Sequence, residues 1–296
     1  MITRTTTDAD QIERIGVVGC GLMGSGIAEV LARAGRDVVV VDANDAGIKG
    51  GRERIEVSLA AAVRRGKLDS DIEARAHEVI RYSTDLGELT DRQLVIEAIT
   101  EAEAVKLALF RRLDEVVEDP EAILASNTSS IPIMKLAVAT RRPEHVVGLH
   151  FFNPVPVLPL VELVASLVTS PETASRASDF ASGVLGKHVI RSQDRAGFIV
   201  NALLIPYLLS AIRMLESGFA TAEDIDAGMV QGCAHPMGPL ALADLIGLDT
   251  TMAVAESLYA EFKEPLYAPP PLLSRMVEAG LLGRKSGRGF LTYGPR

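Results

Sequence analysis

The sequence predicts an α/β protein in which a doubly wound sheet precedes a smaller all-α domain. Across the first two thirds of the chain, short β-branched apolar runs alternate with helix-like segments, which is typical of a parallel sheet with helices on both faces. From Gly197 onward no convincing parallel-strand candidate appears, and apolar residues recur at helical spacing. A glycine-rich turn directly after the first apolar run is the third observation.

That turn, Gly19-Cys20-Gly21-Leu22-Met23-Gly24, has the spacing of a Rossmann-like dinucleotide-binding motif. Gly19 permits the tight turn, Gly21 lets the backbone approach a pyrophosphate, and Gly24 lets the next helix pack closely on the strand. The pyrophosphate is expected at the amino-terminal end of that helix, where unpaired N–H groups favour negative charge. Glycine turns can also serve backbone geometry alone, so the surrounding sequence decides.

A carboxylate at the tip of the second strand supports dinucleotide binding. Asp42 ends the apolar run 38–41 and lies eighteen positions after Gly24. This is close to the roughly 20-residue spacing of the acid that binds the adenosine ribose. Because the carboxylate would repel the extra phosphate of NADP, and no arginine follows in Ala43-Asn44-Asp45, we expect NAD rather than NADP.

The elements of the first domain can be read in order from the same patterns. Short apolar runs bounded by turn residues predict strands at 14–18, 37–41, 79–83, 94–97, 123–126, 146–150 and 188–191. Helical periodicity predicts helices at 24–34, 46–66, 70–77, 102–117, 132–139 and 171–185.

The second domain is expected to contain helices only. They are predicted at 198–216, with a kink at Pro206, and at 221–231, 240–246, 250–262 and 271–279. The change of character near 194–196 divides the chain into a NAD-binding domain, 1–195, and an all-helical domain, 196–296. The apolar excess of this small domain suggests that part of it packs against another subunit.

Composition excludes several classes of protein. The 296 residues carry a net charge of −9, which argues against a nucleic-acid binder. Glycines and Glu29 interrupt the longest apolar stretch, 15–31, so no membrane span is expected, and the first residues do not resemble a secretory signal. Two distant cysteines, Cys20 and Cys233, make no disulfide framework and point to the cytoplasm, and no Cys/His set has metal-ligand spacing.

Three further groups of residues carry candidate chemistry. His150 ends a predicted strand, and an imidazole, with an unperturbed pKa of about 6.5, is a natural base for alcohol oxidation. Glu162 can fold back beside that strand and orient the ring, while Ser129 and Asn201 can hold substrate oxygens. Each also has a structural interpretation: a hydrogen-bonded histidine, a solvated glutamate on a strand, a helix cap, and a cap at the domain junction.

Five motifs occur in order along the chain: residues 19–24, Ser126-Asn127-Thr128-Ser129-Ser130, the His-Phe-Phe-Asn-Pro block at 150–154 with Val155-Pro156-Val157, residues 197–201 and residues 235–239. Together they strongly resemble the 3-hydroxyacyl-CoA dehydrogenases, most closely the bacterial 3-hydroxybutyryl-CoA dehydrogenases. The resemblance extends over nearly the whole chain. It implies NAD-dependent oxidation of an (S)-3-hydroxyacyl-CoA to the 3-ketoacyl-CoA, or the reverse, by a homodimer that associates through its C-terminal domain.

The resemblance also implies roles for individual residues. It makes His150 the base and Glu162 its orienting acid, with Ser129 and Asn201 positioning substrate and coenzyme. The implied NAD contacts are Gly19, Gly21, Leu22, Met23, Gly24, Asp42, Glu101, Lys106, Ser129, Asn153 and Lys285. The implied CoA contacts are Ser58 and Arg65. Arg65 belongs to a basic cluster that could instead be a solvated helix terminus.

Other functions on the same scaffold stay open at this point. A related dehydrogenase could act on a hydroxyacyl group held by a carrier protein or on a free 3-hydroxy acid. An NAD-binding protein without activity is a second alternative, against which the joint presence of Ser129, His150, Glu162 and Asn201 speaks. A subunit of a multifunctional fatty-acid oxidation enzyme is a third, and it would need its hydratase from a separate chain.

Overall fold

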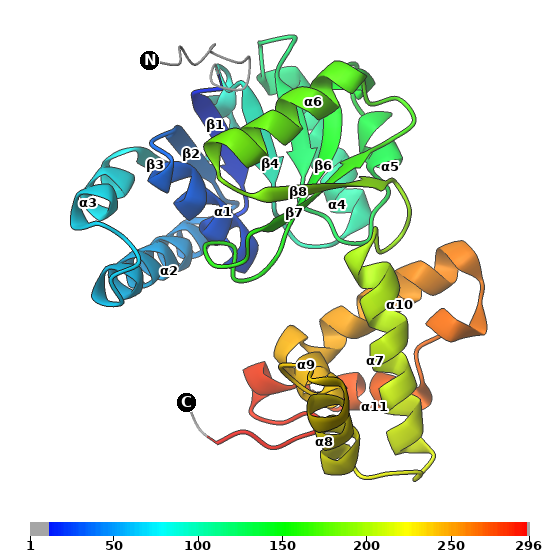
Figure 1. Ribbon diagram of the computed structural model, residues 1–296. Coiled ribbons are helices and arrows are strands. Elements are labelled where there is room, and N and C mark those ends of the chain that lie inside the picture. The colour runs from blue at the N-terminus through cyan, green and yellow to red at the C-terminus, as the bar shows by residue number, and fades with distance from the viewer. Residues whose placement is uncertain (1–11, 295–296) are drawn as a thin grey trace, which may run out of the picture. The chain divides into compact units, whose positions relative to one another are not determined.

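The computed structural model describes residues 12–294, which divide into two compact units, one ending at Asp194 and the other beginning at Arg195 (Figure 1). The initial residues, in which we predict no secretory signal, lie outside this range up to position 11. Each unit is considered separately below.

Within the described residues of the first unit, eight strands form one sheet in the order β3-β2-β1-β4-β5-β6-β7-β8. The strands are β1 (Arg14–Val18), β2 (Asp37–Val41), β3 (Ile80–Ser83), β4 (Leu94–Glu97), β5 (Ile123–Ser126), β6 (Val146–Phe151), β7 (Leu160–Ala165) and β8 (His188–Gln193). Strands β1 to β6 pair in parallel with one another. The chain therefore reverses its winding direction between β1 and β4, where doubly wound sheets bind their ligands.

Helices cover both faces of this sheet. They are α1 (Leu22–Arg33), α2 (Asp45–Arg64), α3 (Ser70–Glu78), α4 (Glu103–Val116), α5 (Ile133–Ala137) and α6 (Pro171–Asp179), with short turns at Leu86–Leu89 and Pro143–His145. In Figure 1, α1 and α6 lie on one face of the sheet and α4 and α5 on the other. Alternate β-strand residues such as Ile15 and Val17 pack with Ile27 of α1 in a buried apolar cluster. The predicted α/β class is confirmed.

The sequence patterns missed β7, and with it the one antiparallel pairing in the described part of the sheet. β7 runs antiparallel to β6 and parallel to β8. Prolines at 154, 156 and 159 made the preceding segment look like a long loop, and the strand itself lacks polar alternation because both of its faces are buried from Val161 to Val164. The sheet is therefore parallel, as expected, except at the β6–β7 pair. The predicted helix 171–185 also changes character, since α6 continues as a π-helical turn at Phe180–Val184.

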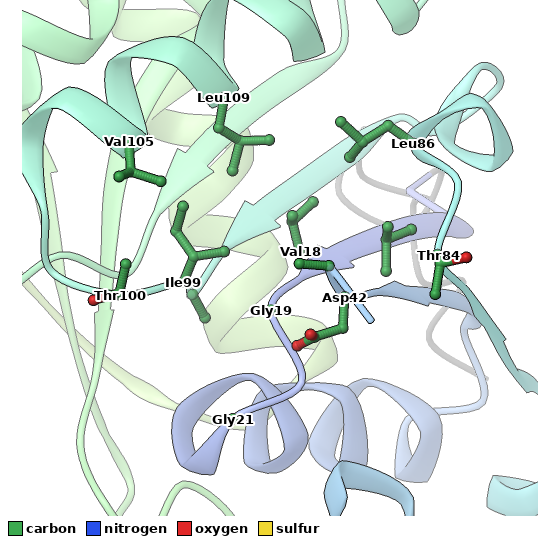
Figure 2. A pocket seen from close by; sticks show the side chains of 13 residues that line it. Val18, Gly19, Gly21, Asp42, Thr84, Leu86, Ile99, Thr100, Val105 and Leu109 are labelled. Carbon is green, nitrogen blue, oxygen red and sulfur yellow. The ribbon is translucent and has the colours of Figure 1, made fainter. Parts of the chain in front are cut away.

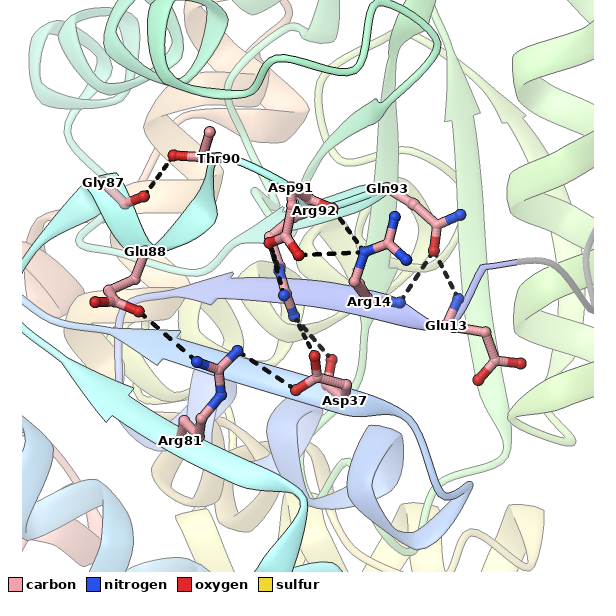
Figure 3. Close-up of polar contacts among 10 residues, drawn as sticks. All are labelled: Glu13, Arg14, Asp37, Arg81, Gly87, Glu88, Thr90, Asp91, Arg92 and Gln93. Atoms are coloured by element: carbon pink, nitrogen blue, oxygen red, sulfur yellow. Dashed lines mark hydrogen bonds and ion pairs between the residues drawn. The ribbon is translucent and has the colours of Figure 1, made fainter.

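A polar network lies where the strands of the sheet begin, at their amino-terminal ends (Figure 3). The Arg92 side chain is only 2% exposed, and its guanidinium lies 2.9 Å from Asp37 and 2.7 Å from Asp91. The side chain of Gln93 accepts hydrogen bonds from the backbone N–H groups of Glu13 and Arg14. These contacts tie the starts of β1, β2 and β4 together, so we assign this network a structural role.

The described residues of the second unit form helices and two isolated β-bridges. The helices are α7 (Val200–Glu216), α8 (Ala222–Cys233), α9 (Pro239–Ile246), α10 (Leu248–Phe262) and α11 (Pro271–Glu278), with short turns at Pro265–Tyr267 and Arg284–Ser286. Leu208 and Ile212 of α7 pack with Leu240 of α9, Leu258 of α10 and Leu273 of α11. α7 continues through Pro206 as one helix.

One buried carboxylate holds the end of the chain against this unit. Asp244, on α9, is 1% exposed. Its oxygens accept hydrogen bonds from the backbone N–H groups of Phe290 and Leu291 and from the Tyr293 hydroxyl, at 3.0, 2.9 and 3.0 Å.

Among the residues from 12 to 294, no helix combines the length and apolarity that a bilayer crossing requires.

The glycine turn after β1 is held by a close backbone approach. A Cβ at Gly24 would lie 1.8 Å from the carbonyl oxygen of Gly19, so a larger residue would force α1 away from the end of β1. Gly19 has a φ of 98°, which glycine adopts without steric cost. The packing role predicted for Gly24 thus has a specific contact behind it.

We expect Gly24→Ala to lower the free energy of unfolding by about 1–3 kcal/mol, the usual cost of overpacking. The same change should weaken NADH binding, because the turn must shift. Gly183→Ala is the control, since a Cβ at Gly183 would meet no atom within 4 Å. Thermal unfolding and NADH titration measure both effects, and equal stability of the two variants would contradict the prediction.

Candidate coenzyme and catalytic site

The carboxyl ends of β1, β2 and β4 surround a cavity of about 610 Å³ (Figure 2). The glycine turn with Gly19 and Gly21 forms one wall, and Asp42 stands at its rim. The cavity lies at the point where the strand order reverses, which is where dinucleotides bind in sheets of this kind. Its remaining side chains are mostly apolar, as suits a flat aromatic ring such as adenine.

Asp42 both faces this cavity and braces the turn beside it. Its Oδ2 accepts a hydrogen bond from the backbone N–H of Cys20 at 2.7 Å. Room for the carboxylate depends on Gly47, where a Cβ would lie 2.2 Å from Asp42 Oδ1. The residues present therefore fit the adenosine half of a dinucleotide: an anion-binding turn, a ribose-binding carboxylate and an apolar cavity.

Several lining residues were not predicted. Beyond the motif, the cavity is lined by Thr84, Leu86, Ile99, Thr100, Val105 and Leu109. All of them follow the carboxyl ends of β3 and β4 or lie on the first turns of α4, so their position after the strands was the available signal. The turn residue Leu22 is 60% exposed, whereas Met23 packs against the apolar cluster.

The Cys20 thiol, within the glycine turn, is expected to be unreactive. Cys20 is fully buried, and a Cβ on Gly51 of α2 would lie 2.0 Å from its Sγ. Burial, with a further contribution from the charge of Asp42, raises the pKa of the Cys20 thiol to about 11. Because thiolate is the reactive form, Cys20 fills space at the α1–α2 contact. Both Cys20 and Cys233 are free thiols.

A histidine and a glutamate face each other across the β6–β7 pair. His150 is directly opposite Glu162 in the antiparallel register, and His150 Nδ1 lies 2.7 Å from Glu162 Oε2. His150 is 6% exposed and Glu162 is fully buried, which excludes the solvated alternative for the glutamate. A carboxylate at Nδ1 places the ring proton there, so the lone pair of the neutral ring lies on Nε2.

The Ser126–Ser130 segment, which begins at the last residue of β5, is fixed by Glu101. Oε1 of Glu101 accepts hydrogen bonds from the backbone N–H groups of Ser129 and Ser130, both at 3.0 Å, and from the Thr128 hydroxyl at 2.5 Å. Burial tends to raise the pKa of Glu101, but the Lys106 charge and the hydroxyl hydrogen bonds outweigh it and lower the pKa below its usual value of 4.5. Glu101 is thus ionised near neutral pH and rigidly holds the backbone of Ser129.

Lys106 occupies a buried position between two carboxylates. Its side chain is 1% exposed, and Nζ lies 2.5 Å from Glu97 Oε1 and 3.1 Å from Glu101 Oε2. Glu97, which the sequence analysis did not select, is fully buried and also accepts a hydrogen bond from the Ser126 hydroxyl at 2.6 Å. Its position as the last residue of β4 was the signal for it. The pair links β4, β5 and α4 at the cavity edge.

A smaller cavity of about 180 Å³ adjoins the glycine turn on the side of α2. Ser58 and Asn153, the predicted CoA and NAD contacts, both line it, together with Leu22 and Ser25 of α1. Arg65 follows the end of α2 and is exposed. The structure thus brings Ser58 and Asn153 to one cavity but does not include Arg65 among its lining residues.

Two predicted site residues belong to the second unit. Asn201 is the second residue of α7 and is half-buried. Lys285 lies in the turn Arg284–Ser286, and its Nζ is 2.6 Å from both carboxylate oxygens of Asp249. The described residues contain no cluster of His, Cys, Asp or Glu that could hold a metal ion.

Removing the cation from the buried pair should be costly. We expect Lys106→Met to lower the free energy of unfolding by about 3–5 kcal/mol, because Glu97 would be left as an uncompensated buried charge. Lys135→Met is the control: Lys135 also pairs with a glutamate, Glu103, at 2.7 Å, but is half exposed and should cost less than about 1 kcal/mol. Urea denaturation of the two variants gives the comparison, and similar losses would contradict a buried ion pair.

Known proteins resemble the chain over nearly its full length. The family model of the 3-hydroxyacyl-CoA dehydrogenase NAD binding domain matches residues 14–195, and that of the 3-hydroxyacyl-CoA dehydrogenase C-terminal domain matches residues 197–293. A 3-hydroxybutyryl-CoA dehydrogenase of Mycobacterium tuberculosis is 62% identical over 285 residues, which cover 96% of this chain and 100% of that protein.

Solved structures agree with these matches. The crystal structure of FadB2 from M. tuberculosis has a TM-score of 0.94 and 62% identity, covering 96% of this chain and 99% of that chain. The (S)-3-hydroxybutyryl-CoA dehydrogenase PaaH1 of Ralstonia eutropha has a TM-score of 0.90 and 45% identity, covering 96% and 100%. The predicted resemblance is confirmed: this chain belongs to the 3-hydroxyacyl-CoA dehydrogenase family.

Proposed function

We propose that this enzyme oxidises (S)-3-hydroxybutyryl-CoA to the 3-ketoacyl-CoA with NAD, or catalyses the reverse reaction. The observation that carries the proposal is the buried His150–Glu162 pair, 2.7 Å apart, on strands of the sheet whose switch point holds the dinucleotide-type cavity. Two relatives that are named 3-hydroxybutyryl-CoA dehydrogenases support the four-carbon CoA ester as substrate.

His150 supplies the base in this mechanism. With a proton on Nδ1 shared with Glu162, Nε2 accepts the proton of the substrate hydroxyl as the C3–H bond breaks. NAD, which the glycine turn and Asp42 would hold, would supply the acceptor for the hydride that leaves C3. In the reverse direction, Nε2 returns the proton to the carbonyl oxygen.

Glu162 makes this proton transfer favourable. The carboxylate is buried beside the ring, so its attraction to the imidazolium is weakly screened by water. It also fixes the orientation of the ring, because His150 and Glu162 stand opposite each other on paired strands. We propose Glu162 as a positioning residue, not as a second base.

The remaining contacts hold the reactants. Ser129 is proposed to hold the oxygen on C3, since Glu101 fixes the backbone that presents its hydroxyl. Asn201 is proposed to hold a second substrate oxygen. Ser58 and Arg65 are proposed to contact CoA, and Lys106, Asn153 and Lys285 to take part in coenzyme binding, by their match to family positions.

We further propose NAD over NADP, a homodimer through the helical unit, and a cytoplasmic location. Asp42 at the cavity rim supports the first, since a second negative charge there would be repelled. Exposed apolar side chains of the helical unit, such as Leu203 at 73% and Phe219 at 79%, support the second. The two free cysteines support the third.

Steady-state kinetics test the proposal as a whole. Short- and long-chain 3-hydroxyacyl-CoA esters, the 3-hydroxybutyryl carrier-protein ester and free 3-hydroxybutyrate are compared with NAD and NADP. The proposal expects the highest kcat/KM for the short CoA ester with NAD. A higher value for the carrier-protein ester or for the free acid would overturn the choice of CoA substrate.

His150→Gln should lower kcat by about 10²–10⁴-fold, because it removes the base but retains the volume. Glu162→Gln should also lower kcat while leaving the Kd of NADH nearly unchanged. His145→Gln, at a histidine before β6 and outside the pair, is the control and should retain activity. A loss in His150→Gln below roughly threefold would mean that another group is the base.

Asp42→Ala should lower kcat/KM for NAD on the order of tenfold, the usual worth of a hydrogen bond to a charged group. It should narrow the difference between NAD and NADP, because the repulsive charge is gone. Asp45→Ala, at an exposed aspartate that starts α2, is the matched control. Unchanged discrimination in Asp42→Ala would show that another feature selects the coenzyme.

A further inference from the structure

An arginine outside the recognised motifs reaches the glycine turn. Arg54 lies on α2, and its Nη2 donates a hydrogen bond to the carbonyl oxygen of Cys20 at 2.7 Å. The side chain also lines the smaller cavity together with Leu22 and Ser25, which belong to the first turn of α1. The guanidinium is therefore fixed beside the end of α1 that favours anions.

The carboxylate that shares the smaller cavity with Arg54, that of Glu29, is paired with Arg33. Within residues 12–294, no carboxylate forms an ion pair with Arg54. Arg52, two positions earlier on the same helix, instead pairs with Glu56 at 2.9 Å on the exposed surface. A guanidinium has five N–H donors in a planar fork, and the Cys20 carbonyl uses only one direction of it. The Arg54 guanidinium thus has further N–H donors beside the turn.

We propose that Arg54 binds the diphosphate of the dinucleotide coenzyme, in addition to the backbone N–H groups of the turn. This inference rests on the proposed NAD-dependent function. A diphosphate seated on the turn would lie next to Cys20, and a planar fork recognises phosphate oxygens in a bidentate manner. The Cys20 bond holds the guanidinium in place before the ligand arrives, which reduces the entropy lost on binding.

CoA also contains a diphosphate, so the choice between the two ligands needs an argument. Of the two predicted CoA contacts, Ser58 lines the same cavity as Arg54, whereas Arg65 lies at the far end of α2. The hydrogen bond of Arg54, however, is with a residue inside the glycine turn. The location at the turn favours the dinucleotide. The experiment below distinguishes the two sources.

The test measures the affinity of purified Arg54→Met for three ligands: NADH, ADP-ribose and adenosine. NADH and ADP-ribose contain the diphosphate and should bind on the order of tenfold more weakly than to the wild type, whereas adenosine should bind equally well. Arg52→Met, which removes a charge from the same helix without touching the turn, should leave all three affinities unchanged. Arg54→Lys should recover part of the loss.

Three outcomes would overturn the proposal. Equal weakening of adenosine, with a lower unfolding temperature of the unliganded protein, would assign Arg54 only to support of the turn. Unchanged NADH affinity would remove the contact. A rise in KM confined to the CoA ester, absent with the N-acetylcysteamine thioester that lacks a diphosphate, would assign Arg54 to CoA. The binding assays need no turnover, so they stand apart from a failure of the proposed reaction.

Discussion

The register between β6 and β7 is the constraint on which the proposed chemistry depends. It sets His150 opposite Glu162 and leaves their nitrogen and oxygen 2.7 Å apart in a buried place. A slip of β7 by one residue would turn Glu162 to the other face of the sheet, away from His150. The flanking apolar pairs, Leu149 with Leu163 and Phe151 with Val161, oppose such a slip because all four are buried. Catalytic geometry is in this way a result of strand packing.

A second polar frame holds the neighbouring strand end. Lys106 joins Glu97 at the tip of β4 to Glu101, and Glu101 in turn holds the backbone of Ser129 and Ser130. Desolvating three ionised groups is expensive, and the arrangement persists because hydrogen bonds satisfy the carboxylate oxygens. Rigidity at this strand end is consistent with preorganised substrate contacts, which need to be placed closely.

The parts that could be predicted from sequence have a local signature. The glycine turn, Asp42 and the parallel strands of the first unit follow from spacing and apolar runs of one or two elements. β7 could not be predicted because a doubly buried strand after three prolines lacks alternation. Glu97 and Arg54 were missed for another reason. Each lies in an ordinary strand or helix pattern, and its partners, Lys106 and Cys20, belong to other elements of the fold.

The hydrogen bonds from residues 290–293 to Asp244 limit how far the chain can be shortened. Three donors near the carboxyl terminus converge on a carboxylate that is 1% exposed. Proteolytic removal of the residues after Gly289 would remove all three donors. The Asp244 carboxylate would then be buried without these hydrogen bonds, which proteins tolerate poorly. Residues 290–293, although near the end of the chain, are thus as integral to the helical unit as any of its helices.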